Sequence, residues 1–204
     1  LYTKIPEVGA DLSKIDVTDT PVLDMLNTRY YIVPLQQGAT APLFNPHALG
    51  NAWLVKEVKY VNNANEEIDA IHGMNPRETA IVDKRFAETV KQPVAMPDSL
   101  DNIVLKSYAP NALQYEVDTK QGGTVVFSEI YYPGWRSYID GEEVSHGRAN
   151  YILRAMNVPA GKHTIEFVFD PQSLHATETI AFIALGIMLL GALGAIVMGL
   201  RKAK

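Results

Sequence analysis

The sequence predicts an α+β region, then a mainly β region that forms a jelly-roll-like β-sandwich, and one transmembrane helix at the C-terminal end. Strands and short helices are mixed up to about residue 92, which is typical of an α+β unit. About seven or eight strand-like runs separated by turn residues follow, which is typical of a β-sandwich. We therefore divide the chain into residues 1–92, 98–175 and 180–200, with a basic tail at residues 201–204.

The α+β region begins with a polar lead-in at residues 1–19. Thr20 is placed to cap a short helix whose first residue is Pro21, where the missing N–H costs nothing. The helical spacing of Ile68 and Ile71 predicts a second helix, and Gly73 lies where a helix usually ends. The remaining pattern predicts strands at residues 30–33, 52–61 and 79–82, a loop at residues 34–46 and a linker at residues 92–98.

The second region consists of apolar runs joined by turns. Asp140-Gly141 is a strong signal for a two-residue hairpin, and we expect residues 159–162 to form another hairpin loop. The last run alternates in a way that fits one face on a core and one face that is more exposed. The predicted strands are at residues 103–108, 113–119, 124–131, 135–139, 151–158 and 163–169.

Residues 180–200 form an uncharged apolar run. As an α-helix this run is about 30 Å long, which matches the hydrocarbon core of a bilayer. Basic residues follow from Arg201, whereas no Lys or Arg lies between Lys162 and Arg201. The positive-inside rule then predicts a cytoplasmic C-terminus and extracytoplasmic residues 1–175. A buried helix of a larger soluble protein is the alternative, although this run shows no polar face.

The charge and composition exclude several classes of function. All 23 acidic residues precede the apolar run, and three of the 18 basic residues follow it. So acidic an outer region is not expected to bind nucleic acid, which requires clustered Lys and Arg. The absence of cysteine excludes disulfides and thiol nucleophiles. The chain starts at Leu1 without a signal peptide, so we expect it to be the C-terminal piece of a longer protein.

Small residues recur every four positions in the apolar run, at Gly191, Ala195 and Gly199. Such a stripe allows close packing against another helix, and we expect upstream transmembrane helices of the same protein as its partner. The alternative is that Gly and Ala are simply frequent in transmembrane helices.

Four longer motifs stand out along the chain. They are LDMLNTRYYIV at residues 23–33, NPHALGNAWLV at residues 45–55, SEIYYPGWRSYIDGEEV at residues 128–144 and RANYILRAMNVPAGKHTIEFVFDP at residues 148–171. In this order, and followed by a basic-tailed span, they resemble the C-terminal region of the bacterial YfhO family of membrane proteins. The resemblance covers essentially the whole chain.

This resemblance implies a polytopic protein of the bacterial cytoplasmic membrane that ends in an extracytoplasmic domain and one closing span. YfhO-like proteins are similar to GT-C glycosyltransferases, which transfer sugar from a polyprenyl-phosphate carrier to acceptors such as cell-envelope polymers. The catalytic acid of those enzymes lies in the first extracytoplasmic loop, which is not in this sequence. We therefore assign no catalytic residue, expect no cofactor, and predict an accessory domain that covers the active site or holds the acceptor.

Two other functions stay open. The chain can be a membrane-anchored β-sandwich that binds carbohydrate or an envelope partner without any enzyme attached. It can also be a structural domain that stabilises the membrane region and binds nothing. The number of spans before Leu1 separates the first of these from the glycosyltransferase prediction.

The segment around Pro133-Gly134 is the first candidate site for a glycan or a polyprenyl-phosphate sugar. Flat faces of Tyr132 and Trp135 beside Arg136 suit stacking on a sugar ring and hydrogen bonding to its hydroxyls. The alternative is that Pro133-Gly134 makes a tight turn and the aromatic residues fill the sandwich core.

A second candidate cluster follows in the next motif. It consists of Arg148, Asn150, Tyr151 and Arg154. Arginine suits a carrier or acceptor phosphate because its planar fork can bind two oxygens. The alternative is a local ion pair with Asp140, Glu142 or Glu143.

No metal site is predicted. The five histidines show no metal-ligand spacing and none lies in a zinc motif; they are His47, His72, His146, His163 and His175. The carboxylates of Glu142 and Glu143 lie beside a hairpin turn, where we expect them to be solvated. No glycine loop of the kind that cradles phosphate is present.

Overall fold

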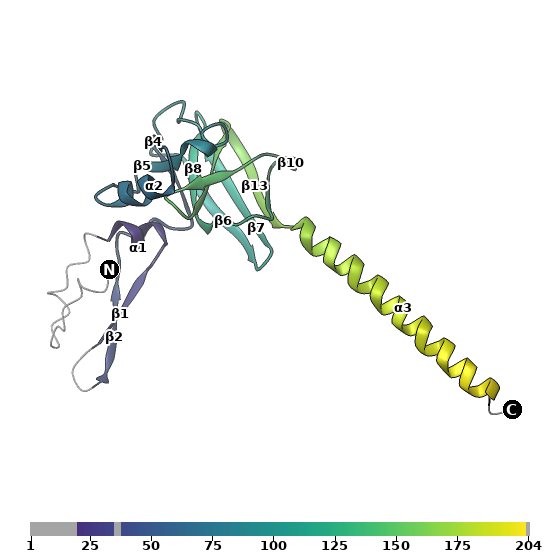
Figure 1. Cartoon of the computed structure of the whole chain (residues 1–204). Helices are drawn as coiled ribbons and strands as arrows, with labels where there is room; N and C mark the ends of the chain where they lie inside the picture. The colour runs from purple at the N-terminus through teal and green to yellow at the C-terminus, as the bar shows by residue number, and fades with distance from the viewer. Residues whose placement is uncertain (1–19, 35–37, 203–204) are drawn as a thin grey trace.

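The computed structural model describes residues 20–34 and 38–202 (Figure 1). It consists of a β-rich body from which a long C-terminal helix leads away. The polar lead-in expected at residues 1–19 and the last two residues of the basic tail lie outside the described residues.

Two antiparallel sheets form the β-sandwich that the sequence predicts. The five-stranded sheet has the order β10-β9-β13-β7-β6, and the four-stranded sheet has the order β11-β12-β8-β3. The strands are β3 (Ala52–Val55), β6 (Asn102–Ala109), β7 (Ala112–Thr119), β8 (Gly123–Ile130), β9 (Trp135–Ile139), β10 (Glu142–Glu143), β11 (Gly147–Ala149), β12 (Leu153–Val158) and β13 (Gly161–Phe169). The hairpin turn predicted at Asp140-Gly141 joins β9 to β10, and both residues have positive φ. The hairpin predicted at residues 159–162 is wrong, because the strands on either side of it, β12 and β13, belong to different sheets.

Aromatic rings fill the space between the two sheets. Tyr115 and Phe167 come from the five-stranded sheet, and Phe127 comes from the four-stranded sheet. All three are fully buried and meet edge to face, with ring centroids 4.9–6.2 Å apart. Such aromatic pairs stabilise a core beyond the area that they bury, by about 0.5–1.5 kcal/mol each.

The central strand β8 is buried on both faces, and this explains its continuous apolar run. Val125 and Phe127 point into the sandwich, whereas Val126 belongs to a second core on the other side of the sheet. That second core packs against a smaller unit of two parallel strands and one helix. These are β4 (Glu57–Val61), β5 (Thr79–Asp83) and α2 (Ala64–Ile71).

The single strand predicted at residues 52–61 is wrong, because two strands of different sheets lie there. β3 pairs with β8 in the sandwich, and β4 pairs with β5. The chain leaves one sheet for the other at Lys56, where the amides of Lys56 and Glu57 both donate to the Glu78 carbonyl. One strand from the first predicted region therefore belongs to the sheet of the second, and the division of the chain near residue 92 stays a prediction.

The loop predicted at residues 34–46 contains a strand that the pattern missed. β2 (Thr40–Phe44) pairs with β1 (Tyr30–Pro34) to form a hairpin, and the short helix α1 (Pro21–Met25) precedes it with Pro21 at its first position, as predicted. The inner face of the hairpin holds Tyr31 and Val33. Its outer face exposes more than half of Tyr30, Ile32 and Phe44.

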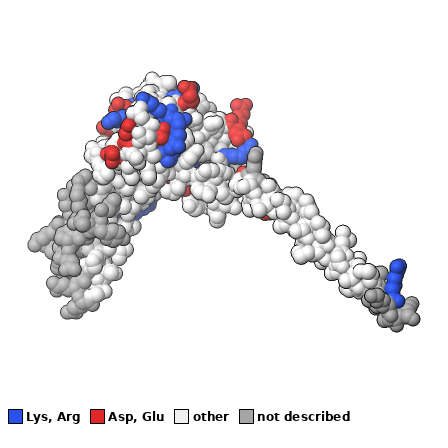
Figure 2. Space-filling view, viewed as in Figure 1, with Lys and Arg blue, Asp and Glu red and all other residues white. Residues whose placement is uncertain are grey.

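The C-terminal helix α3 (Gln172–Lys202) contains the predicted span. Within it, residues Ala176–Ile196 are long and apolar enough to cross a membrane, and none of that stretch is buried against the rest of the chain. Figure 2 shows charged side chains gathered on the body and at the far end of the helix. Between Glu178, near the start of the helix, and Arg201 the sequence has no charged residue. The helix therefore has the form of a membrane span that carries the β-rich body at one end.

Candidate functional site

A groove of about 500 Å³ opens at the end of the sandwich next to α3. Residues 131–137 form one wall, and residues 143–146 form the other. A backbone hydrogen bond connects the groove wall to the start of the helix: the amide of Asp170 donates to the carbonyl of Gly134 at 2.8 Å. Gly134 has a φ of +104°, and a Cβ there would lie 2.9 Å from the Cβ of Pro171. Only glycine allows the chain to turn this closely against the helix entry.

The aromatic residues of the groove differ in how freely they face solvent. The side chain of Tyr132 is 61% exposed. Trp135 is half-buried, and its ring centre lies 5.3 Å from that of Phe169 and 4.0 Å from the guanidinium of Arg154. Strand alternation predicts that at most one tyrosine of the Tyr131-Tyr132 pair is exposed with Trp135, and Tyr132 is that residue.

Arg136 lies exposed at the groove and is held by two carboxylates. Its Nε and one terminal nitrogen donate to the two oxygens of Glu143 at 2.9 and 2.5 Å, and Asp170 lies 3.5 Å from the other nitrogen. The hydrogen bonds from Arg136 lower the pKa of Glu143, and Glu143 raises the pKa of Arg136. The pair therefore presents a fixed charged fork beside the aromatic rings.

Ser137 and His146 form a further polar contact in the groove that sequence reasoning missed. The hydroxyl of Ser137 donates to the Val144 carbonyl and lies 2.8 Å from Nδ1 of His146. Since the single hydroxyl proton is used, Nδ1–H of His146 donates to the serine oxygen. Burial, with a smaller effect of Arg154, lowers the pKa of His146 to about 4, so the imidazole is neutral. A nucleophilic serine needs a neighbouring base that accepts its proton. Here the histidine donates to the serine instead, so Ser137 is not an activated nucleophile.

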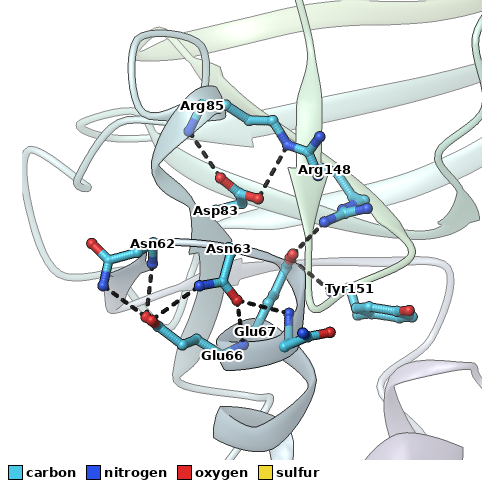
Figure 3. Close-up of polar contacts among 9 residues, drawn as sticks. Asn62, Asn63, Glu66, Glu67, Asp83, Arg85, Arg148 and Tyr151 are labelled. Atoms are coloured by element: carbon cyan, nitrogen blue, oxygen red, sulfur yellow. Dashed lines mark hydrogen bonds and ion pairs between the residues drawn. The ribbon is translucent and has the colours of Figure 1, made fainter.

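The second predicted cluster joins the sandwich to the α2 unit. Glu67 of α2 is fully buried, and its two oxygens accept from Arg148 at 2.5 Å and from the amide of Tyr151 at 2.8 Å (Figure 3). Burial raises the pKa of Glu67, while these two donors act in the opposite direction. The expected local partners of Arg148, near residues 140–143, are wrong, because the glutamate that pairs with it is 81 residues away in sequence.

The helix start positions Glu67 for this contact. The side chain of Asn63 caps α2 by accepting from the amides of Asn65 and Glu66, and Figure 3 shows this cap beside the ion pair. A capped first turn holds the following residue in helical geometry, which directs Glu67 toward Arg148.

Asn150 acts as a substitute strand partner for β5. It has a φ of +50°, its amide donates to the Ile81 carbonyl at 2.7 Å, and its side-chain oxygen accepts from the Ile81 amide at 2.8 Å. Asn150 is fully buried. These bonds give Asn150 a structural role, which explains an asparagine at this position without ligand binding.

Arg154 lies between the two candidate clusters, behind the groove wall. It is 2% exposed, its Nε donates to the Ile130 carbonyl at 3.0 Å, and its guanidinium lies 5.0 Å from the centre of the Phe167 ring. The structure thus brings Tyr132, Trp135 and Arg136 together at the groove, with Arg154 supporting Trp135. It places Arg148, Asn150 and Tyr151 in the joint with α2.

The comparison with family models concerns the part of the chain that holds this groove. Residues 90–181 match the family described as bacterial membrane protein YfhO. This region belongs to the YfhO family. The match covers every sandwich strand except β3, and it ends within α3. Searches of curated proteins and of solved structures give no match.

Among the residues that the structure describes, no three His, Asp or Glu side chains are grouped so that they could hold a metal ion. The chemistry available at the groove is therefore that of aromatic faces, an arginine fork, carboxylates and neutral hydrogen-bonding groups. Such a set suits binding of a polar, uncharged ligand with apolar faces.

Proposed function

We propose that this chain is the extracytoplasmic domain and closing span of a YfhO-like membrane protein, and that its groove holds a saccharide near the outer surface of the bacterial cytoplasmic membrane. In the full protein this domain serves a transferase that draws sugar from a polyprenyl-phosphate carrier and glycosylates envelope polymers. The domain itself takes the role of an accessory or acceptor-binding part, and the transfer takes place elsewhere in the protein.

One observation carries the proposal. Beside the start of α3, the groove combines an exposed Tyr132, a rigidly held Trp135 and the ion pair of Arg136 with Glu143. A sugar ring has an apolar face that stacks on an aromatic ring, and hydroxyls that bond to arginine and carboxylate groups. A groove beside the start of a membrane span lies at the level where the sugar of a lipid carrier projects from the bilayer.

The test is saccharide binding by the chain in lipid nanodiscs, followed by saturation-transfer NMR. The probes are glucose, N-acetylglucosamine and their polyprenyl phosphates. We expect Tyr132→Ala to weaken binding by about tenfold, which corresponds to about 1.4 kcal/mol. Tyr30→Ala removes a tyrosine of similar exposure from β1 and should leave binding unchanged. Absence of saccharide signal from the unaltered chain would contradict the proposal.

The role in glycosylation is tested in cells with the full-length protein. Tyr132→Ala should reduce envelope glycan while the protein accumulates normally in the membrane. If the variant binds saccharide poorly in nanodiscs but envelope glycan is unchanged, the domain is an anchored carbohydrate-binding module without a transferase, which is the second candidate function.

A further inference from the structure

The end of the sandwich from which α3 leaves exposes several large apolar side chains. Tyr108, at the end of β6, is 67% exposed; Ile130, at the end of β8, is 52% exposed; and Tyr132 follows in the next loop. Residues 107–114 and 130–135 around them contain no charged side chain. We call this set, Tyr108, Ile130 and Tyr132, the aromatic edge.

Backbone hydrogen bonds hold both parts of the aromatic edge at the helix entry. The amide of Phe169 donates at 2.9 Å to Asn111, in the turn between β6 and β7. The next amide, that of Asp170, donates to Gly134 in the loop that carries Tyr132. The ring of Tyr132 also lies 6.3 Å from that of Phe169. The edge therefore cannot move far from the first residue of α3 while these bonds are intact.

The helix sets the distance from the aromatic edge to the bilayer. α3 begins at Gln172, the stretch that is long and apolar enough to span begins at Ala176, and the uncharged run begins at Ile180. About 6–12 Å of helix therefore separates the sandwich from the hydrocarbon core. The headgroup region on each side of a bilayer is roughly 5–8 Å thick. This spacing places the aromatic edge in the headgroup layer or directly at its outer surface.

We propose that the aromatic edge inserts into the headgroup layer and holds the sandwich against the membrane at a fixed orientation. Tyrosine suits this depth because its ring is apolar and its hydroxyl reaches water. The absence of charge in both loops removes the desolvation cost that would oppose insertion. Tyr132 also lines the groove, whereas Tyr108 and Ile130 lie outside it, so labels and variants near Tyr108 test membrane insertion separately from saccharide binding.

The test uses the cysteine-free chain reconstituted in vesicles of phosphatidylethanolamine and phosphatidylglycerol. Single spin labels are placed at Ala109→Cys and Pro133→Cys, which leave the aromatic edge intact. A label at Lys59→Cys, an exposed position of β4, is the control. Power saturation compares access to oxygen, which concentrates in lipid, with access to a water-soluble nickel complex. We expect the labels at 109 and 133 to favour oxygen at least threefold more than the label at 59. Equal ratios at the three positions would overturn the proposal.

A second variant tests whether the side chains cause the contact. Tyr108→Ser should shift the label at 109 toward the nickel complex, whereas Tyr30→Ser on the distant hairpin should not. Shielding of labels 109 and 133 from both reagents would show that protein covers this end instead of lipid, which also overturns the proposal. Near-ultraviolet circular dichroism of Trp53 and Trp135 confirms that each variant is folded.

Discussion

The guanidinium of Arg154 lies 4.0 Å from the centre of the Trp135 ring, between the two sheets of the sandwich. One face of Trp135 is thereby held by a buried cation, and part of the ring is left at the groove. The arrangement explains how a single aromatic residue can belong both to the core and to a binding surface. It also makes the groove depend on a residue that a ligand does not reach.

Arg154→Lys should destabilise the chain although charge is kept. Lysine loses the bond from Nε to the Ile130 carbonyl and the planar stacking on Trp135, so we expect a loss of about 2–3 kcal/mol. Urea unfolding in detergent micelles, followed by tryptophan fluorescence, measures this loss. The matched control is Arg136→Lys, an exposed arginine that should change stability little. Equal midpoints for the two variants would contradict the prediction.

Glu67→Gln should weaken the joint between α2 and the sandwich. The change leaves Arg148, whose side chain is only 17% exposed, without its opposite charge, and we expect a loss of about 2 kcal/mol. Unfolding by urea in micelles gives the value, and Glu57→Gln, at an exposed position of β4, serves as control.

A double-mutant cycle identifies the cause of that loss. Arg148→Met added to Glu67→Gln should recover part of the stability, because the uncompensated buried charge is then absent. Additive losses would show that the two residues act independently and that the ion pair does not hold the joint.

The stability of the folded chain should fall as the pH drops from 6.5 toward 4. Burial and Arg154 lower the pKa of His146 to about 4, from 6.5 for a free imidazole. Between these values the unfolded state binds a proton that the folded state does not, so unfolding becomes easier, by at most about 3 kcal/mol. Urea unfolding at several pH values gives the dependence.

His146→Asn should flatten this pH dependence, because the amide can still donate to Ser137 but does not titrate. Titration of His163 serves as a control, because it changes stability with pH in the opposite direction. Its hydrogen bond to Asp140 raises its pKa, so its contribution is present below pH 6.5 and is lost as the pH rises through the folded-state pKa. If His146→Asn leaves the acid-side loss unchanged, another group is responsible.

Gly134→Ala should disturb the groove more than Gly141→Ala does. Both glycines have positive φ, so each alanine costs about 1–3 kcal/mol of backbone strain. At Gly141 nothing lies within 4 Å of the new methyl group, whereas at Gly134 it meets Pro171 at 2.9 Å. Thermal unfolding gives the stability difference, and saccharide binding reports on the groove. Identical effects of the two substitutions would show that contact with Pro171 is unimportant.

Local sequence patterns were sufficient to predict the membrane helix and most of the strands. The uncharged run predicted α3, the Asp140-Gly141 pair predicted the β9–β10 hairpin, and alternation along residues 163–169 predicted which face of β13 is buried. These features depend on residues that are close in sequence, so side-chain period and turn chemistry are enough to define them.

Long-range pairing decided the rest. Nothing in residues 52–61 shows where one sheet ends and the next begins, because no Gly, Pro or Asn separates the two strands and the partners β8 and β5 are distant in sequence. In the same way, an arginine at position 148 predicts an ion pair, but only the folded chain brings Glu67 next to it. A charge pairs with whichever opposite charge the backbone places within a few ångströms, and tertiary structure alone determines that placement.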